Sequence, residues 1–343
     1  MLHFDSDYMR GAHPEVMRRL METNLSQSVG YGSDEYTARA AGLILDACGL
    51  NRSESKVVFL TGGTQTNSTV IDSFTQRHQG VICAETGHIN VHEAGAVEAT
   101  GHKVLTLPSH EGKICATELD NYISDFFRDE TWEHMVAPGM VYISFPTELG
   151  TIYTLKELED ISKVCHSHGI TLYLDGARLG YGLAASNEVT LHDIARLCDV
   201  FYIGGTKVGT LFGEAVVVKD AARWLHSLSQ VKRHGALLAK GRLLGIQFET
   251  LFTDDLYLRA SRNAIVQAMK LKEGFLAAGF RLFMDSPTNQ QFFILPNERL
   301  DALKETATFE LWGPRGPEET PVRFVTDWGT TDEEIERLLI QLR

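Results

Sequence analysis

Seven short apolar segments, separated by stretches with helical patterns, constrain the fold of this chain most strongly. In chain order they are KVVFLTGG, GVICAE, KVLTLP, MVYISF, ITLYLD, DVFYIGG and EAVVV. Several are continuously apolar rather than alternating, which is expected of strands buried on both faces of a mainly parallel sheet. The clearest intervening helix begins at Thr154, where Glu157 completes a capping box, and stops at Gly169. This alternation predicts an α/β fold with a mostly parallel, seven-stranded sheet.

The C-terminal part of the chain has a different pattern. After about residue 220 the strand pattern gives way to a long helical region and a helix over residues 256–278. Short strand candidates follow in QQFFILP and PVRFVTDW, and a terminal helix begins at Asp332. We therefore predict a large domain over residues 1–250 and a small α+β C-terminal domain over residues 251–343.

Composition excludes several classes of protein. The formal net charge of -13 argues against nonspecific binding to nucleic acid, which depends on basic surface. No apolar stretch approaches the roughly 20 residues that span a bilayer, and the first residues lack a signal-peptide pattern, so we expect a cytoplasmic protein without membrane contact. The five cysteines are scattered, odd in number and without a CxxC pair, which indicates buried thiols rather than disulfides or zinc ligands.

Two of the predicted strands end in residues that carry chemistry. Lys207 follows DVFYIGG, and Asp175 and Arg178 follow ITLYLD. A buried lysine is costly, and one at a strand's C-terminal end is typical of a site where the unprotonated amine forms a Schiff base with an aldehyde such as pyridoxal phosphate (PLP). A carboxylate on a neighbouring strand end would hold the pyridine nitrogen protonated, the state in which PLP is an electron sink. Taken alone, the same residues also fit a surface-turn lysine and a helix-capping aspartate.

Segment 56–71, KVVFLTGGTQTNSTVI, predicts a strand, a glycine turn and a helix. This order places the backbone N–H groups of Gly63, Thr64 and Gln65 at a helix N-terminus, where a phosphate is favoured. The turn is neither GxGxxG nor GxxxxGK[ST], so the sequence predicts no dinucleotide site and no P-loop. Other strand-to-helix turns carry Gly and Thr without binding phosphate, so the segment alone does not decide the matter.

A histidine follows the second predicted strand. In AETGHINVHEAGA, His88 is expected near the C-terminal edge of the sheet, where ligands bind in open α/β folds. An ordinary loop histidine is the alternative. His92 and Glu93 are the other metal-ligand types nearby, but no further ligand set is visible, and we expect no metal site.

Taken together, the motifs resemble the L-threonine aldolase group of the β-eliminating lyase family, which consists of fold-type I (aspartate aminotransferase-like) PLP enzymes. The resemblance runs in order from about residue 4 to residue 335. The motifs that carry it are SDxxxGxHPEV, YGSDEYTARA, GGTQTN, ETGHINVHEAGA, FPTELGTIYTLKEL, LDGARL, GGTKVG and VRFVT. It implies PLP as the cofactor and an amino acid as the substrate.

The resemblance also implies roles around the cofactor ring. Lys207 would bind PLP as a Schiff base, Asp175 would pair with the pyridine nitrogen, and His88 would stack on the ring. Arg178 would lie close to the phenolic oxygen and to the substrate.

Further roles concern the phosphate and the substrate. Gly63 and Thr64 would bind the phosphate, with help from Thr206. Ser6 and Arg323 would bind the substrate carboxylate, the arginine by its two-pronged geometry.

The family also implies an oligomer. The segment from Tyr31 to Asp34 corresponds to one that reaches the active site across a subunit boundary, which implies a homodimer or homotetramer.

Two segments depart from the family pattern. Where many relatives have ENTH, with a histidine that contacts the substrate hydroxyl, this chain has PTEL and places Glu148 there. Where they have GGGMR, this chain reads KRHGALLAKGR, and Arg233, Lys240 and Arg242 are equal candidates for the missing arginine.

These parts predict retro-aldol cleavage of a β-hydroxy-α-amino acid, of the L-threonine or L-allo-threonine type, to glycine and an aldehyde. Glu148, or a base acting through water, is the candidate for removing the hydroxyl proton. One alternative is a β-eliminating lyase or aminotransferase acting on a small amino acid, and another is a non-catalytic PLP-binding protein. Sequence alone leaves open the preferred amino acid, the configuration at its β-carbon, and the choice between dimer and tetramer.

Overall fold

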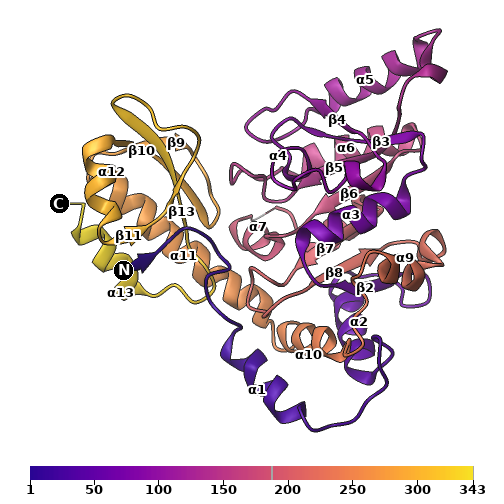
Figure 1. The fold of residues 1–343 in the computed structure, drawn as a ribbon, viewed down its shortest axis with the longest axis horizontal. Helices are drawn as coiled ribbons and strands as arrows, with labels where there is room; N and C mark the ends of the chain where they lie inside the picture. The colour runs from indigo at the N-terminus through magenta and orange to yellow at the C-terminus, as the bar shows by residue number, and fades with distance from the viewer. Residues whose placement is uncertain (187, 343) are drawn as a thin grey trace.

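The larger lobe of the protein is built on a seven-stranded sheet with the order β2-β8-β7-β6-β5-β3-β4 (Figure 1). The computed structural model describes residues 1–186 and 188–342. The strands are β2 (Lys56–Leu60), β3 (Gln79–Ala84), β4 (Val104–Leu107), β5 (Ala137–Ser144), β6 (Thr171–Asp175), β7 (Val200–Gly204) and β8 (Glu214–Val218). Within this sheet β8 runs antiparallel to both neighbours, and the other pairs are parallel. The predicted α/β fold with a mostly parallel sheet of seven strands is confirmed.

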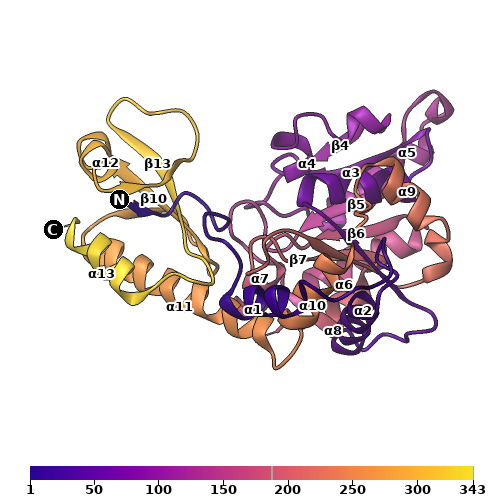
Figure 2. The same ribbon diagram turned by 60° about the horizontal axis from the view of Figure 1, so that its bottom comes forward.

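Helices cover both faces of this sheet, as the turned view shows (Figure 2). They are α1 (Pro14–Thr23), α2 (Glu35–Ala47), α3 (Gly63–Phe74), α4 (His88–Val91), α5 (Ala116–Arg128), α6 (Leu155–Ser167), α7 (Leu179–Ala185), α8 (Leu191–Leu197), α9 (Ser227–Arg233) and α10 (Arg242–Leu251). Short 3₁₀ helices lie at Glu98–Thr100, Trp132–His134 and Ala221–Trp224. The capping box predicted at Thr154 and Glu157 is present at the start of α6.

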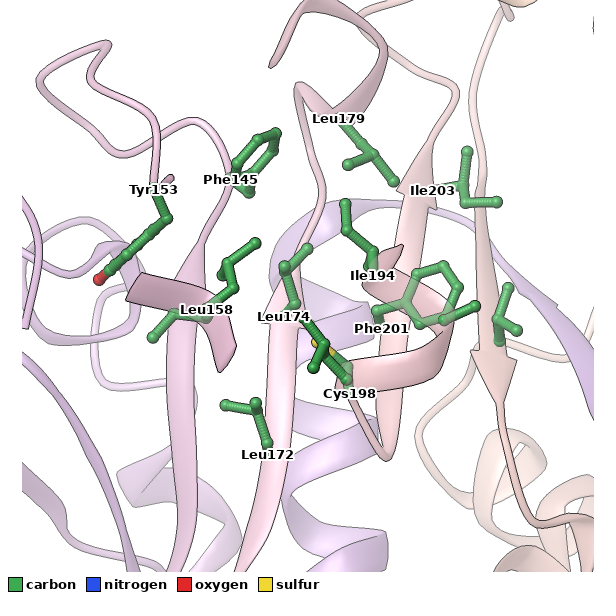
Figure 3. Close-up of a cluster of buried hydrophobic side chains, with 14 of the residues drawn as sticks. Phe145, Tyr153, Leu158, Leu172, Leu174, Leu179, Ile194, Cys198, Phe201 and Ile203 are labelled. Atoms are coloured by element: carbon green, nitrogen blue, oxygen red, sulfur yellow. The ribbon is translucent and has the colours of Figure 1, made fainter. Parts of the chain in front are cut away.

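Side chains of each central strand alternate between two buried clusters. In β6, Leu172 and Leu174 pack with helices such as α6 and α8 on one face (Figure 3). Tyr173 points into the cluster on the opposite face, where it packs with residues of α3. Because both faces are buried, every position in such a strand favours an apolar side chain, which explains the continuous apolar runs.

The smaller lobe is antiparallel. Its sheet has the order β12-β13-β10-β9, and a separate pair joins β1 to β11 in parallel. The elements are β1 (Leu2–His3), β9 (Arg281–Met284), β10 (Gln290–Pro296), β11 (Ala307–Thr308), β12 (Glu310–Leu311), β13 (Glu319–Val325), α11 (Leu256–Ala277), α12 (Asn297–Lys304) and α13 (Asp332–Ile340). These include both strands and both helices predicted beyond residue 255.

Two segments connect the lobes. Helix α11 packs against α7 in the larger lobe and against α13 in the smaller one (Figure 1). The N-terminal strand β1 belongs to the smaller lobe, although α1 packs on α10. The domain division at residue 250 stays a prediction, and the position of β1 shows that the chain's first residues contribute to both lobes.

The cysteines and the helices bear on two further expectations. Four cysteines are buried, but Cys115 is exposed before α5, so the prediction of buried thiols was wrong at this position. In the two described ranges, none of the helices has the length and apolar character needed to cross a membrane.

Candidate active site

The candidate site is a cavity of about 210 Å³ at the edge of the large sheet where β5, β6 and β7 end and β8 begins. Eight of the residues predicted from sequence line it: Gly63, Thr64, His88, Glu148, Asp175, Arg178, Thr206 and Lys207. A larger hollow of about 760 Å³ lies among α1, α10 and α11, but it contains none of the predicted site residues. The chemistry therefore points to the smaller cavity.

Lys207 lies in the turn that follows β7. Its backbone carbonyl accepts a hydrogen bond of 2.6 Å from the hydroxyl of Tyr181. Burial of the ammonium group, together with the positive charge of Arg178, lowers the pKa of Lys207 to about 8, although neighbouring carboxylates act in the opposite direction. An amine with this pKa is largely unprotonated in mildly alkaline solution, where it can attack an aldehyde.

Asp175 is the last residue of β6 and is buried. Its carboxylate accepts hydrogen bonds from Asn67 Nδ2 at 2.9 Å, from the Tyr142 hydroxyl at 2.7 Å and from the Ala177 N–H at 2.9 Å. Burial alone would raise the pKa of Asp175, but the attraction of His88 and hydrogen bonds from Tyr202, Tyr142 and the Ala177 N–H outweigh it and lower the pKa below its ordinary value. Asp175 is therefore a fixed negative charge at the base of the cavity.

The N-terminus of α3 forms another wall. Gly62 precedes the helix, and no side chain caps this end within the described residues. The cavity-lining residues Gly63 and Thr64 thus begin a twelve-residue helix whose first N–H groups have no side-chain acceptor. An uncapped helix N-terminus fits the phosphate of PLP, and Lys207 and Asp175 in the same cavity fit its aldehyde and its pyridine nitrogen.

Glu214 was not predicted, and it organises the turn that carries Lys207. It is the first residue of β8, and its carboxylate accepts hydrogen bonds from the Thr206 hydroxyl at 2.7 Å and from the Gly205 N–H at 3.0 Å. Burial raises the pKa of Glu214 to about 7, against the effect of these hydrogen bonds. The Thr206 hydroxyl donates its hydrogen to Glu214. The predicted contact of Thr206 with the phosphate of PLP stays a prediction.

His88 begins α4, and Glu148 lies directly beside it. Glu148 Oε1 accepts hydrogen bonds from the His88 backbone N–H at 2.9 Å and from the Ser144 hydroxyl at 2.6 Å. Burial raises the pKa of Glu148, and the Ser144 hydrogen bond opposes this rise only in part. The imidazole of His88 faces a second carboxylate, because its Nδ1 lies 2.8 Å from Glu93 Oε1.

Arg178 is engaged by a residue of the N-terminal segment. Its Nε and Nη2 donate to the two carboxylate oxygens of Asp7 at 2.7 and 3.1 Å. Asp7 also accepts a hydrogen bond of 2.9 Å from Asn289 in the smaller lobe. Burial alone would raise the pKa of Asp7, but Arg178 outweighs it and holds the pKa below its ordinary value. Sequence reasoning placed Arg178 at the site but missed this partner.

Ser6 and Arg323 are not among the residues that line the 210 Å³ cavity. Ser6 precedes Asp7, the partner of Arg178. Burial and the positive charge of Arg178 lower the pKa of Arg323. Arg323 donates to Gln290 at 2.8 Å and to Glu310. Within the described residues, Ser6 Oγ and Arg323 Nε are buried without a hydrogen-bond partner. Both atoms can therefore still bind an acceptor such as a carboxylate.

Tyr31 lies outside the cavity of its own chain. It borders a separate hollow of about 190 Å³, and the Lys232 ammonium lies 5.4 Å from the centre of its ring. A role for Tyr31 in a partner's site stays a prediction.

The three candidates for the missing arginine also stay open. Arg233 pairs with Asp72, Arg242 donates to the Asn24 carbonyl at 3.1 Å, and Lys240 lies between them in sequence.

Metal chemistry has no candidate ligands here. In residues 1–186 and 188–342, no group of three or more His, Cys, Asp or Glu side chains could hold an ion.

Comparisons with known proteins agree with this geometry. A sequence profile of the family described as beta-eliminating lyase matches residues 3–294. The low specificity L-threonine aldolase of Pseudomonas aeruginosa is 30% identical, in a match that covers 99% of this chain and 96% of that protein. The protein of the same name from Pseudomonas sp. gives the same identity and coverage.

Solved structures give the same result. A threonine aldolase structure from Leishmania major is similar with a TM-score of 0.95 and 41% identity, and the match covers 100% of this chain and 98% of that one. A histidinol-phosphate aminotransferase from Clostridium acetobutylicum is similar in fold alone, with a TM-score of 0.75 and 14% identity over 100% of this chain and 98% of that one. The motif-based resemblance and the predicted fold-type I architecture are thus confirmed.

Proposed function

Because this chain belongs to the β-eliminating lyase family, we propose that it is a PLP-dependent lyase that cleaves a β-hydroxy-α-amino acid to glycine and an aldehyde. The substrates we propose are L-threonine and L-allo-threonine. The observation that carries the proposal is the convergence of Lys207, Asp175 and the uncapped N-terminus of α3 on one cavity. The relatives named for threonine aldolase activity support the choice of substrate.

The cofactor is held by three groups of the chain. We propose that Lys207 binds the aldehyde carbon covalently, that Asp175 accepts the hydrogen of the pyridine nitrogen, and that the N–H groups at Gly63 and Thr64 bind the phosphate. His88 would lie against the ring. When bound, PLP supplies an electron sink for the electron pair left on Cα when one of its bonds breaks.

The substrate carboxylate is expected to select which bond breaks. Within the described residues, Ser6 Oγ and Arg323 Nε are buried without hydrogen-bond partners, and Arg178 lines the cavity. The positive charge of Arg178 lowers the pKa of both Arg323 and Lys207. We propose that these three residues would bind the carboxylate and so fix the orientation of the Cα–Cβ bond in the cavity.

The proton of the β-hydroxyl needs an acceptor. Burial raises the pKa of Glu148, so its carboxylate is a stronger base than an ordinary glutamate and is better suited to accept a proton. We propose that Glu148 accepts this proton directly or through a water molecule. The proposal also includes a cytoplasmic homodimer or homotetramer in which Tyr31 contacts the site of a partner.

Product analysis tests the function. Purified protein with PLP is given L-threonine, L-allo-threonine and phenylserine, and glycine and aldehyde are quantified; serine is tested in parallel for pyruvate. Equal amounts of glycine and aldehyde are expected. Pyruvate and ammonia from serine, with no glycine from any hydroxy amino acid, would replace retro-aldol cleavage by β-elimination. The E148Q variant should keep bound PLP but release glycine more slowly, whereas an unchanged rate would remove Glu148 from the mechanism.

A further inference from the structure

Glu93 is a buried acidic residue that the proposed mechanism does not use. It follows α4, lines the cavity, and has a side chain with no exposed surface. Its Oε1 is within hydrogen-bond distance of two site residues, and within the described residues its Oε2 has no partner. A buried carboxylate with one unpaired oxygen is costly, so a purely structural purpose does not account for it.

The hydrogen-bond partners of Glu93 have fixed donor and acceptor roles. Asn67 Nδ2 donates to Glu93 Oε1 at 2.7 Å and to Asp175 Oδ2 at 2.9 Å, while Asn67 Oδ1 accepts from the Tyr173 hydroxyl at 2.7 Å. Two carboxylates that accept and one hydroxyl that donates allow only this orientation of the amide. Asn67 therefore links Glu93 rigidly to Asp175.

The same reasoning fixes His88. Glu93 Oε1 already acts as an acceptor, since Asn67 Nδ2 donates to it. The nitrogen that lies 2.8 Å from the same oxygen, His88 Nδ1, is therefore the donor and carries the hydrogen. When the imidazole carries this single hydrogen, Nε2 is the acceptor. The turn after Glu93 is itself held in an uncommon conformation, since Ala94 has φ 51°.

We propose that Glu93 is a positioning residue that holds the His88 imidazole in its Nδ1–H form and, through Asn67, links its orientation to that of Asp175. His88 and Asp175, which face different parts of the cofactor, are thereby set by one hydrogen-bonded unit. This inference rests on the proposed PLP function of the cavity.

The first test reads the tautomer directly. Protein containing ¹⁵N-histidine and loaded with PLP gives imidazole nitrogen signals by NMR, and the H88Q variant identifies those of His88. We expect the Nδ1–H form in the wild type and in E93Q, whose amide oxygen still accepts, and its loss or averaging in E93A. An Nδ1–H form that persists in E93A would overturn the proposal. This readout needs no turnover, so it decides the question even where no glycine is released.

A double-mutant cycle provides the second test. We expect E93A to lower kcat roughly 10- to 100-fold, the scale for loss of a partner that orients a functional histidine, with KM changed much less. Because Glu93 acts chiefly through His88, adding E93A to H88Q should cost much less than E93A costs in the wild type. Losses that multiply in the double variant would contradict this.

Two further variants complete the cycle. E93Q should retain more activity than E93A, and it replaces E93A in the cycle if E93A does not fold. E98Q, a neighbouring exposed position, is the matched control and should behave as the wild type.

Discussion

Asp175 and Glu214 show how the surroundings assign different behaviour to two residues with the same functional group. Both are buried acids at the cavity, yet the pKa of Asp175 is lowered and that of Glu214 is raised to about 7. Burial raises the pKa in both cases, but Asp175 also has the attraction of His88 and accepts three hydrogen bonds. Asp175 thus stays ionised, as the proposed pairing with a pyridine nitrogen requires, while Glu214 can exchange a proton near neutral pH.

The D175N variant should bind PLP but lose on the order of 100-fold in kcat, because it removes the charge that stabilises the protonated pyridine ring. Glycine release from L-threonine measures this loss. D301N removes a carboxylate from a surface ion pair and is the matched control, with an unchanged rate expected. A D175N variant as fast as the wild type would exclude the role assigned to Asp175.

Glu214 should control the pH at which Lys207 reacts. The neutral amine is the reactive form, so the rate at which cofactor-free protein binds PLP should rise as pH increases through about 8. Glu214 stabilises the ammonium form, and E214Q removes that negative charge. The midpoint of the pH profile should therefore move to lower pH in E214Q and stay in place in E98Q. A midpoint that is unchanged or higher in E214Q contradicts the argument.

The sequence predicts the site residues that stand at strand ends and in local motifs, and it misses those that only the fold brings near. Lys207, Asp175 and His88 each follow an apolar run, so the pattern of the chain reveals them. Asp7 meets Arg178 across 171 positions of sequence, and no local pattern marks such a pair. Asn67 could be noticed from the sequence only as the last residue of the motif GGTQTN.

At the scale of secondary structure, burial decided which elements could be predicted. The strands β3, β5, β6, β7 and β8 of the large sheet are buried on both faces, and their sequences are largely continuous apolar runs. The missed strands β1, β9, β11 and β12 are two to four residues long, and β9 alternates between exposed and half-buried positions. The long helical region after residue 220 is divided into α9 and α10 by the turn around Gly235, whose φ is 69°.

Helix α6 allows a prediction about stability. Replacing Thr154 with Ala removes the side-chain acceptor of the Glu157 N–H at the helix start. The free energy of unfolding should fall by about 0.5–2 kcal/mol, measured by urea denaturation, without a change in PLP affinity. T154S keeps the hydroxyl and should remain near the wild-type value. Equal stability of T154A and T154S would show that the cap does not contribute.

At the scale of the whole molecule, the cavity depends on both lobes. Asp7 belongs to the N-terminal segment and contacts Arg178 of the larger lobe and Asn289 of the smaller one. Helix α11 packs on both lobes as well. The relative position of the lobes therefore affects the arginines that we assign to the substrate carboxylate.

The oligomer can be tested by complementation. If Tyr31 completes the site of a partner subunit, Y31A and K207A should each be nearly inactive, and hybrids made by co-expression should regain part of the activity. Each hybrid has one site in which Lys207 and the partner's Tyr31 are both native. Hybrids that remain inactive, or a Y31A variant with full activity, would contradict a shared site.

The most direct test of the central claim, that Lys207 binds PLP covalently in this cavity, is to locate the attachment point. Protein loaded with PLP is reduced with borohydride, digested and analysed by mass spectrometry. We predict the added mass of the reduced cofactor on the peptide that contains Lys207, and its absence from K207A, with K163A behaving as the wild type. Attachment to another lysine, or none in the wild type, would contradict the account.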